Sequence, residues 1–274
     1  MQWEQLLSDE HYSNQQMLDY KSFRDGYDTI ICSTLFRRLQ DKAQVFPLDE
    51  DDYVRTRLTH SLEVSAIGKK LGEYVFRKLK AQQKDPWFDA NNEKAFSDIL
   101  LCAGLVHDIG NPPYGHAGEA AIQSWANRIA NKIEPNAKSW YDIELFDGNA
   151  QGFHLLSRCD PRPNSYYHFT CASLGAVVKY PWTSIDANKK GSKKFDVFSI
   201  DEDSFKMIWG ELGLVKGEKY LRHPLSYLSE AADDICYRIL DFEDAVVSGI
   251  LPESEVRGIL TACLKPEDRK VAKF

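Results

Sequence analysis

The chain has 274 residues, of which 43% are hydrophobic and 27% are charged, so it can bury a sizeable core in one large domain or two small ones. Its net charge of −7 argues against broad affinity for DNA or for a membrane surface, since both are anionic. The six cysteines show no CxxC or CxH spacing, which favours reduced thiols over disulfides or zinc ligands. The absence of a signal peptide and of a long apolar run predicts a cytoplasmic protein without a membrane partner.

The first third of the chain is expected to be an arm followed by two helical segments. Residues 1–20 are polar and aromatic, and we expect them to pack on the body or on a neighbour. Residues 29–39 show a helical pattern closed by Arg37 and Arg38, and residues 40–47 lead into an acidic loop at 49–52. A long helix is predicted to start near Arg55, with His60 in its first turns and a core face made of Leu58, Leu62, Ile67, Leu71 and Val75.

The middle of the chain is predicted to hold one buried helix and a rigid turn. Residues 80–92 form a polar connection, and residues 95–109 form the buried helix. Gly110 and the pair Pro112-Pro113 end that helix, and a short helix follows over residues 117–129. Residues 131–165 are mixed in character, and the residues that punctuate them are Gly148, Gly152, Pro161 and Pro163.

The last third is dominated by one strong helix. Residues 169–180 form an amphipathic or buried run that ends at Pro181, and residues 186–194 form a polar, basic and mobile loop. His223 and Pro224 open a helix that runs through Val247 and ends at Gly249, because proline suits a first helical position. Strand signals are few, so the fold class is mainly α.

Metal-type ligands gather where the buried helix ends. Two histidines and two carboxylates, His107, Asp108, His116 and Glu119, fall within the stretch 107–119. Such groups are costly at the end of a buried helix unless something binds them, and a divalent metal accepts both nitrogen and carboxylate ligands. The adjacent pair Asp233-Asp234 lies in an apolar helix and raises the same requirement for a cation.

The order of these residues resembles the HD-domain metal-dependent phosphohydrolases, and longer strings narrow the resemblance to deoxyguanosinetriphosphate triphosphohydrolases and related deoxynucleoside triphosphate hydrolases. The likeness covers roughly residues 20–250. The strings that carry it are Arg55-Thr-Arg57-Leu-Thr-His60-Ser-Leu-Glu-Val64, His107-Asp-Ile-Gly-Asn-Pro-Pro-Tyr-Gly-His-Ala-Gly-Glu119, Gly148-Asn-Ala-Gln151, Glu230-Ala-Ala-Asp-Asp-Ile235, Phe36-Arg-Arg-Leu-Gln40, Gln44-Val-Phe-Pro47, Leu174-Gly175 and Lys179-Tyr-Pro181.

The resemblance implies an HD-domain helical bundle around a metal site. It assigns the four metal ligands to His60, His107, Asp108 and Asp233. Asp233 is preferred over Asp234 because the last HD ligand directly follows an alanine, here Ala232. Two histidines and two carboxylates suit Mn²⁺ or Mg²⁺ first, and Fe, Ni or Zn also fit such a set.

The resemblance also implies a general acid–base group and contacts to substrate. His116, oriented by Glu119, is expected to move a proton; read without the family, Glu119 offsets a helix dipole and His116 caps the helix. Gln44 and Asp241 are expected to bind the 3′-hydroxyl of the sugar, beside which Tyr237 packs. The residues expected near the phosphates or lining the site are Arg57, Lys179, Tyr180, Asn149 and Gln151, of which Lys179, Asn149 and Gln151 also suit ordinary surface positions.

The implied activity is hydrolysis of a deoxynucleoside triphosphate, with dGTP first, to the deoxynucleoside and inorganic triphosphate. Two alternatives stay open: the same metal site acting on a nucleoside monophosphate or phosphodiester, and a non-catalytic fragment that oligomerises or senses nucleic acid. Implied partners are a homo-oligomer and a single-stranded nucleic acid or nucleotide effector. We expect one HD-type domain over residues 1–274, with an arm at 1–20 and a metal-binding core at 55–250. Family members are usually longer, so the resemblance implies that their C-terminal region is absent here.

Overall fold

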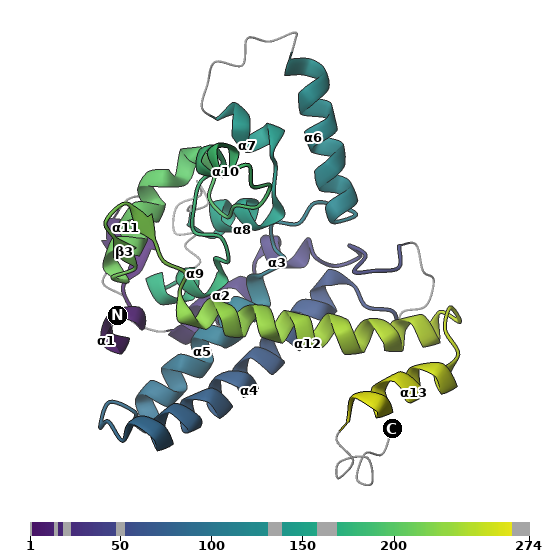
Figure 1. Cartoon of the computed structure of the whole chain (residues 1–274), viewed down its shortest axis with the longest axis horizontal. Helices are drawn as coiled ribbons and strands as arrows, with labels where there is room; N and C mark the ends of the chain where they lie inside the picture. The colour runs from purple at the N-terminus through teal and green to yellow at the C-terminus, as the bar shows by residue number, and fades with distance from the viewer. Residues whose placement is uncertain are drawn as a thin grey trace.

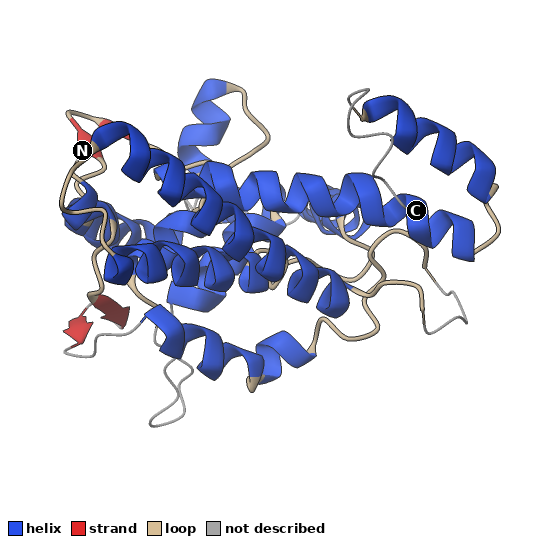
Figure 2. Cartoon of the chain, turned by 90° about the horizontal axis from the view of Figure 1, so that it is seen from below, coloured by secondary structure: helices blue, strands red, loops and turns tan. Residues whose placement is uncertain are grey.

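Helices make up most of the protein in its computed structural model, which describes residues 2–13, 16–18, 23–47, 53–130, 139–157 and 169–264 (Figures 1 and 2). The mainly α class is confirmed, and within these ranges the strands form only two antiparallel hairpins, which lie at the end opposite α13. None of the described helices combines the length and the apolar character needed to cross a membrane. The elements are α1 (Trp3–Leu6), β1 (His11–Ser13), β2 (Gln16–Leu18), α2 (Phe23–Ile31), α3 (Thr34–Arg37), α4 (Arg57–Gln83), α5 (Ala90–Val106), α6 (His116–Ala130), α7 (Trp140–Glu144), α8 (Gly148–Ser157), α9 (Cys171–Val177), α10 (Ser184–Lys190), η1 (Ser199–Asp201), α11 (Glu202–Glu211), β3 (Val215–Lys216), β4 (Lys219–Tyr220), α12 (Pro224–Val247) and α13 (Glu253–Cys263).

The three longest helices, α4, α5 and α12, form the frame of the fold, and α12 crosses the other two (Figure 1). Every residue of α5 from Phe96 to Val106 is buried, as the apolar run predicted. The pair α4 and α5 packs unusually closely, since a Cβ atom on Gly104 would lie only 2.7 Å from the Cα of Ser65. The Ser65 hydroxyl donates to the carbonyl of Leu101 at 2.7 Å, which satisfies it within this contact.

The predicted core face of α4 is wrong at Leu62, which is 37% exposed. The other four predicted residues are half-buried and pack against the buried core. The most deeply buried positions beside them are small or polar ones together with Val64 and one large ring, namely Ser61, Val64, Ser65, Gly68, Gly72 and Phe76. Small side chains let the backbones of α4 and α5 approach, so the tightest interface carries little of the apolar signal that periodicity measures.

The N-terminal arm packs on the body, which is one of the two expected arrangements. The Trp3 ring stacks on that of Trp87 at 5.8 Å and meets that of Phe96 at 5.6 Å. Phe88 beside them is buried. The predicted polar connection at 80–92 is therefore wrong, because α4 continues to Gln83 and residues 84–89 are anchored by two aromatic side chains.

Local capping changes two other expected elements, and a third differs for another reason. The pattern over 29–39 is split into α2 and α3 because the Ser33 side chain accepts a hydrogen bond from the N–H of Phe36 and starts a new helix. The basic loop expected at 186–194 is mostly the helix α10, which is capped by Thr183 and closed by Gly191 at φ 64°. Gly148 and Gly152 lie inside α8 and do not interrupt it. The acidic loop at 49–52 and the prolines at 161 and 163 lie outside the described residues.

The predicted bounds of the last strong helix are confirmed in α12, which His223 caps with its side chain. Nδ1 of His223 accepts from the N–H of Leu225 at 3.1 Å, and Nε2 lies 2.9 Å from the carbonyl of Leu6. A carbonyl can only accept, so the ring is the neutral tautomer with its proton on Nε2. Burial lowers the pKa of His223 from 6.5 to about 4.

Because the buried His223 stays neutral in the folded protein, we expect the free energy of unfolding to fall in acid. Below pH 6.5 the unfolded chain binds a proton that the native His223 does not bind until about pH 4, so the free energy of unfolding falls between these values. The contribution of this group is about 3 kcal/mol, from roughly 1.4 kcal/mol per pKa unit. His223→Asn keeps a capping acceptor without the titration, and its urea-unfolding free energy should change less over this pH range. Equal slopes for the variant and the wild type would contradict this assignment.

Candidate functional site

One cavity of about 460 Å³ collects the predicted site residues. Four further residues with polar side chains line it, Asn111, Asp147, Lys194 and Glu230, which the sequence analysis did not single out as site residues. The predicted residues that line it are Gln44, Arg57, His60, His107, Asp108, His116, Glu119, Asn149, Lys179, Tyr180, Asp233, Tyr237 and Asp241. Gln151, which we also considered, is not among its lining residues.

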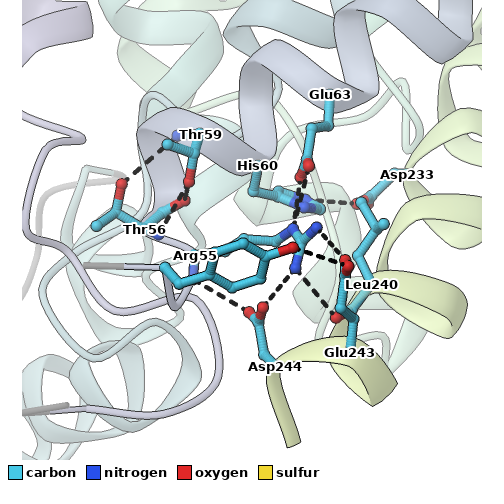
Figure 3. A network of polar contacts seen from close by, with 10 residues as sticks. Arg55, Thr56, Thr59, His60, Glu63, Asp233, Leu240, Glu243 and Asp244 are labelled. Atoms are coloured by element: carbon cyan, nitrogen blue, oxygen red, sulfur yellow. Dashed lines mark hydrogen bonds and ion pairs between the residues drawn. The ribbon is translucent and has the colours of Figure 1, made fainter. Parts of the chain in front are cut away.

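The metal-type residues converge at the bottom of this cavity from α4, the end of α5 and α12. Oδ1 of Asp233 lies 3.1 Å from Nε2 of His60 and 3.5 Å from Nε2 of His107 (Figure 3 shows the first pair). Nε2 of His107 is 3.6 Å from Oδ1 of Asp108. One ligand atom each from His60, His107 and Asp108 lie within 4.8 Å of one another, a spacing that suits a single cation.

The tautomer of His107 leaves a free lone pair in the cavity. Its Nδ1 lies 2.7 Å from the carbonyl of Gly104, which can only accept, so Nδ1 carries the proton. The other ring nitrogen, Nε2, is buried and has no hydrogen-bond partner. A buried acceptor without a donor is unfavourable, and a backbone carbonyl that fixes the far nitrogen is typical of metal-binding histidines. The donor set therefore fits a divalent metal.

The electrostatics of the cluster keep both carboxylates ionised. Burial raises the pKa of Asp108, but nearby positive charge, from His107 in its protonated form and from the Arg57 guanidinium, lowers it below its ordinary value. Burial likewise raises the pKa of Asp233, and His107, His60 and Lys179 outweigh it, so the net shift is strongly downward. Two negative oxygens thus face two histidine nitrogens, which is the charge balance that a cation site requires.

Asp108 is held on both of its oxygens by neighbouring side chains. The Arg57 guanidinium donates to Oδ2 at 2.6 Å, and the Asn111 amide donates to Oδ1 at 2.5 Å. The Lys42 ammonium in turn donates to the carbonyl of Asn111 at 2.8 Å. Arg57, expected near phosphates, therefore also positions a ligand. Asn111 could have been suspected from its place three residues after Asp108 and directly before the Pro112-Pro113 pair.

A strained turn places His116 at the mouth of the cavity. Tyr114 and Gly115 both have positive φ, 64° and 51°, and a Cβ on Gly115 would lie 2.5 Å from an Arg57 nitrogen. His116 begins α6 and is exposed, whereas Glu119 one turn later is buried. Oε1 of Glu119 accepts from the N–H of Gly148 at 2.7 Å, and these described residues show no hydrogen bond between His116 and Glu119. The expected orientation of His116 by Glu119 is therefore not seen, because the free N–H at the start of α8 takes the carboxylate.

Glycines bring α8 against the turn that follows α5. A Cβ on Gly110 would lie 2.1 Å from the nitrogen of Gly152, and one on Gly148 would lie 2.2 Å from Oδ1 of Asn111. This approach sets Asp147 and Asn149 into the cavity wall. Asp147 accepts from the N–H of Asn149 at 2.9 Å and pairs with the Lys194 ammonium at 3.2 Å.

The opposite wall comes from α12 and the segment after α9. Asp234 pairs with Arg238 at 3.6 Å and is not among the residues that line the cavity, whereas Asp233 is. The Lys179 ammonium lies 3.5 Å from Oδ2 of Asp233 and is largely buried, unlike a solvated surface lysine. Burial raises the pKa of Asp241 to about 6.

Gln44 and Glu230 also line the cavity. Oε1 of Gln44 is buried and has no hydrogen-bond partner, so this amide has an acceptor free for a ligand. The Glu230 carboxylate is held by the Arg222 guanidinium at 2.7 Å. The cavity therefore combines unpaired acceptors and held carboxylates with the cations Lys179 and Lys194.

Comparison with known proteins gives one family model and many relatives. The HD domain matches residues 57–142. Over 94% of its length the chain is 41% identical to a Deoxyguanosinetriphosphate triphosphohydrolase-like protein of Synechocystis sp., of which it covers 62%. It is 39% identical over 93% of its length to a protein of that description from Listeria monocytogenes, of which it covers 58%. It is 33% identical over 83% of its length to a Deoxyguanosinetriphosphate triphosphohydrolase of Yersinia pestis, covering 50%. The chain thus spans between half and two thirds of these curated relatives.

Proposed function

Because this chain matches the HD domain over residues 57–142 and is similar over 94% of its length to a deoxyguanosinetriphosphate triphosphohydrolase-like protein, we propose that it hydrolyses deoxynucleoside triphosphates, with dGTP preferred, to the deoxynucleoside and inorganic triphosphate. The observation that carries the proposal is the single cavity that joins the His60, His107, Asp108 and Asp233 cluster to polar residues from α6, α8 and α12. A homo-oligomeric state, a nucleotide or single-stranded nucleic-acid effector and a cytoplasmic location belong to the same proposal.

His60, His107, Asp108 and Asp233 would hold a divalent metal, Mn²⁺ or Mg²⁺ first. When bound, such a cation polarises a phosphoryl oxygen and lowers the pKa of water. The protein contributes the shape of the site, since Arg57 and Asn111 fix Asp108 and the carbonyl of Gly104 fixes His107. Phosphoryl transfer depends mainly on such positioning and on charge stabilisation.

His116 supplies the proton for the leaving group. Water attacks the α-phosphorus, the bond from phosphorus to O5′ breaks, and His116 protonates O5′. The exposed position of His116 at the start of α6 leaves its ring free to meet a nucleotide that enters the cavity. Glu119 supports this step by holding the N-terminus of α8, and with it Asn149, beside the turn that carries His116.

The remaining lining residues divide between the phosphates and the sugar. Lys179, Tyr180 and Asn149 contact the triphosphate, where a cation gives charge-assisted hydrogen bonds. Gln44 and Asp241 bind the 3′-hydroxyl, and the Tyr237 ring packs beside the sugar. The half-buried carboxyl of Asp241 can accept the one hydrogen bond that the hydroxyl donates, and the amide nitrogen of Gln44 can donate to the hydroxyl oxygen.

Product analysis tests the proposal. The wild-type protein is incubated with each of the four deoxynucleoside triphosphates in the presence of Mn²⁺ or Mg²⁺, and the products are separated by anion exchange. We expect deoxynucleoside and free triphosphate in equal amounts, fastest with dGTP. Release of orthophosphate or diphosphate would refute the reaction, and turnover only of nucleoside monophosphates or phosphodiesters would favour a different substrate class for the same site.

A further inference from the structure

Arg55 lies just outside the cavity and joins two helices through one guanidinium group (Figure 3). Its side chain is 10% exposed and contacts three carboxylates. Nε donates to Glu63 of α4 at 2.9 Å, and one terminal nitrogen donates to Glu243 of α12 at 2.5 Å. The other terminal nitrogen donates to Asp244 of α12. Arg55 therefore links the start of α4 to the C-terminal half of α12.

The acceptors on α12 flank Asp241, the residue assigned to the sugar. The nitrogen that binds Asp244 also lies 3.4 Å from the carbonyl of Leu240. The backbone N–H of Arg55 donates to Oδ2 of Asp244 at 3.1 Å, and the Asp244 side chain is only 1% exposed. These contacts thus hold Leu240, directly before Asp241, and Asp244, three positions after it. A planar, charged fork fixed at several points restrains a helical turn more firmly than a single ion pair does.

Apolar contacts hold α12 as far as Leu240 and weaken beyond it. Ala232 and Cys236 pack against Val64 of α4 in a small buried cluster beside Asp233, and the partly buried Leu240 also packs against this cluster. Beyond Leu240, the residues of α12 that are buried are Asp244 and Ala245. In the described part of the chain, Arg55 is thus the main polar link from this half of α12 to α4, while Asp233 has a support of its own.

We propose that Arg55 is a positioning residue that fixes the turn 240–244 of α12 and thereby places the Asp241 carboxyl against the 3′-hydroxyl of the substrate. The proposal rests on the proposed function for its substrate. It separates two supports within one helix: the contacts of Val64 with Ala232 and Cys236 place Asp233, and Arg55 places Asp241. Loss of Arg55 should therefore impair sugar discrimination while the metal cluster stays intact.

The test compares Arg55→Met and Arg55→Lys with the wild type and with Asp241→Ala. The ratio of kcat/KM for dGTP to that for the dideoxy analogue should fall at least tenfold in Arg55→Met, toward the value in Asp241→Ala. Affinity for Mn²⁺, measured by titration, should stay within twofold of the wild type. Arg55→Lys, which keeps the charge but not the fork, should recover part of the ratio. A ratio equal to the wild type, or a parallel loss of Mn²⁺ affinity, would overturn the proposal.

Two further measurements separate positioning from a general loss of stability. Amide hydrogen exchange in Arg55→Met should accelerate over residues 237–247 and not over 57–76, and unchanged exchange would refute the proposal. Phe205→Leu, at a buried position of α11, should lower stability without changing the ratio, and an equal fall of the ratio in this control would contradict the proposal. If the wild type hydrolyses no deoxynucleoside triphosphate, the proposed function fails. The ratio of dissociation constants for the deoxy and dideoxy nucleotides, with the exchange data, then decides the role of Arg55.

Discussion

A His107→Ala variant is expected to lose its stoichiometric divalent metal and, with it, its turnover. The Nε2 lone pair of His107 faces Asp233 and Asp108, and the carbonyl of Gly104 fixes that orientation. Alanine removes one of the four proposed donors and takes away an imidazole that lies 3.6 Å from Asp108 and 3.5 Å from Asp233. Loss of a first ligand is more severe than loss of an outer-shell partner, which itself typically reduces metal affinity ~10–100-fold.

Elemental analysis of the purified protein after dialysis measures this effect directly. The matched control is Asp234→Asn. Asp234 is next to Asp233 in sequence, but its side chain pairs with Arg238 and it is not among the residues that line the cavity. The control should retain wild-type metal content and turnover. Metal content in His107→Ala equal to that of the wild type would remove His107 from the ligand set.

Replacing His116 with alanine is expected to slow turnover by ~10²–10⁴-fold while the metal stays bound, which is the usual contribution of a general acid–base group. His116 lines the cavity and, among the described residues, makes no hydrogen bond or ion pair with the metal-type cluster, so its loss should leave that cluster unchanged. Steady-state kinetics with dGTP, together with metal analysis, measure both effects. An undiminished rate in His116→Ala would exclude it as the proton donor.

Two substitutions of Glu119, which is on the same helix as His116, separate the effect of its negative charge from that of its hydrogen bond to Gly148. Glu119→Ala removes the acceptor for the N–H of Gly148 and should slow turnover by orders of magnitude, because α8 loses its anchor. Glu119→Gln keeps an oxygen acceptor at that point and should lose much less. The exposed Asn127 of α6, replaced by alanine, serves as a control with no expected effect. Equal losses in Glu119→Gln and Glu119→Ala would show that the negative charge acts, and that the bond to Gly148 does not explain its role.

The elements that sequence analysis predicted well are those with strong local signals. His223 and Pro224 start α12 and the residues before Gly249 end it, because capping and helix termination are decided within a few residues. His60, His107, Asp108 and Asp233 also line one cavity, although 173 positions separate His60 from Asp233 along the chain. Histidine and aspartate in an apolar helix indicate a polar site from their residue type alone, whatever their distance along the chain.

The errors concern features that depend on distant partners. Gly148 and Gly152 are indistinguishable from turn residues in sequence. In the structure a Cβ on Gly148 would lie 2.2 Å from Oδ1 of Asn111, whereas one on Gly152 would lie at an ordinary contact distance of 3.8 Å from the nitrogen of Gly110. The serines and glycines of α4 carry no apolar signal, although they form its closest contact with α5. The link from Glu119 to Gly148 and the hold of Arg57 on Asp108 could not be read from spacing either, since each joins separate elements.

Hydrolysis of dGTP in water labelled with the heavy oxygen isotope, followed by mass spectrometry of both products, tests the proposed reaction most directly. Attack of water on the α-phosphorus with cleavage of the bond to O5′ places the label in the inorganic triphosphate and leaves deoxyguanosine unlabelled. Label in deoxyguanosine would contradict that mechanism. Formation of deoxyguanosine monophosphate with diphosphate, or of the nucleoside diphosphate with orthophosphate, would contradict the proposed activity itself.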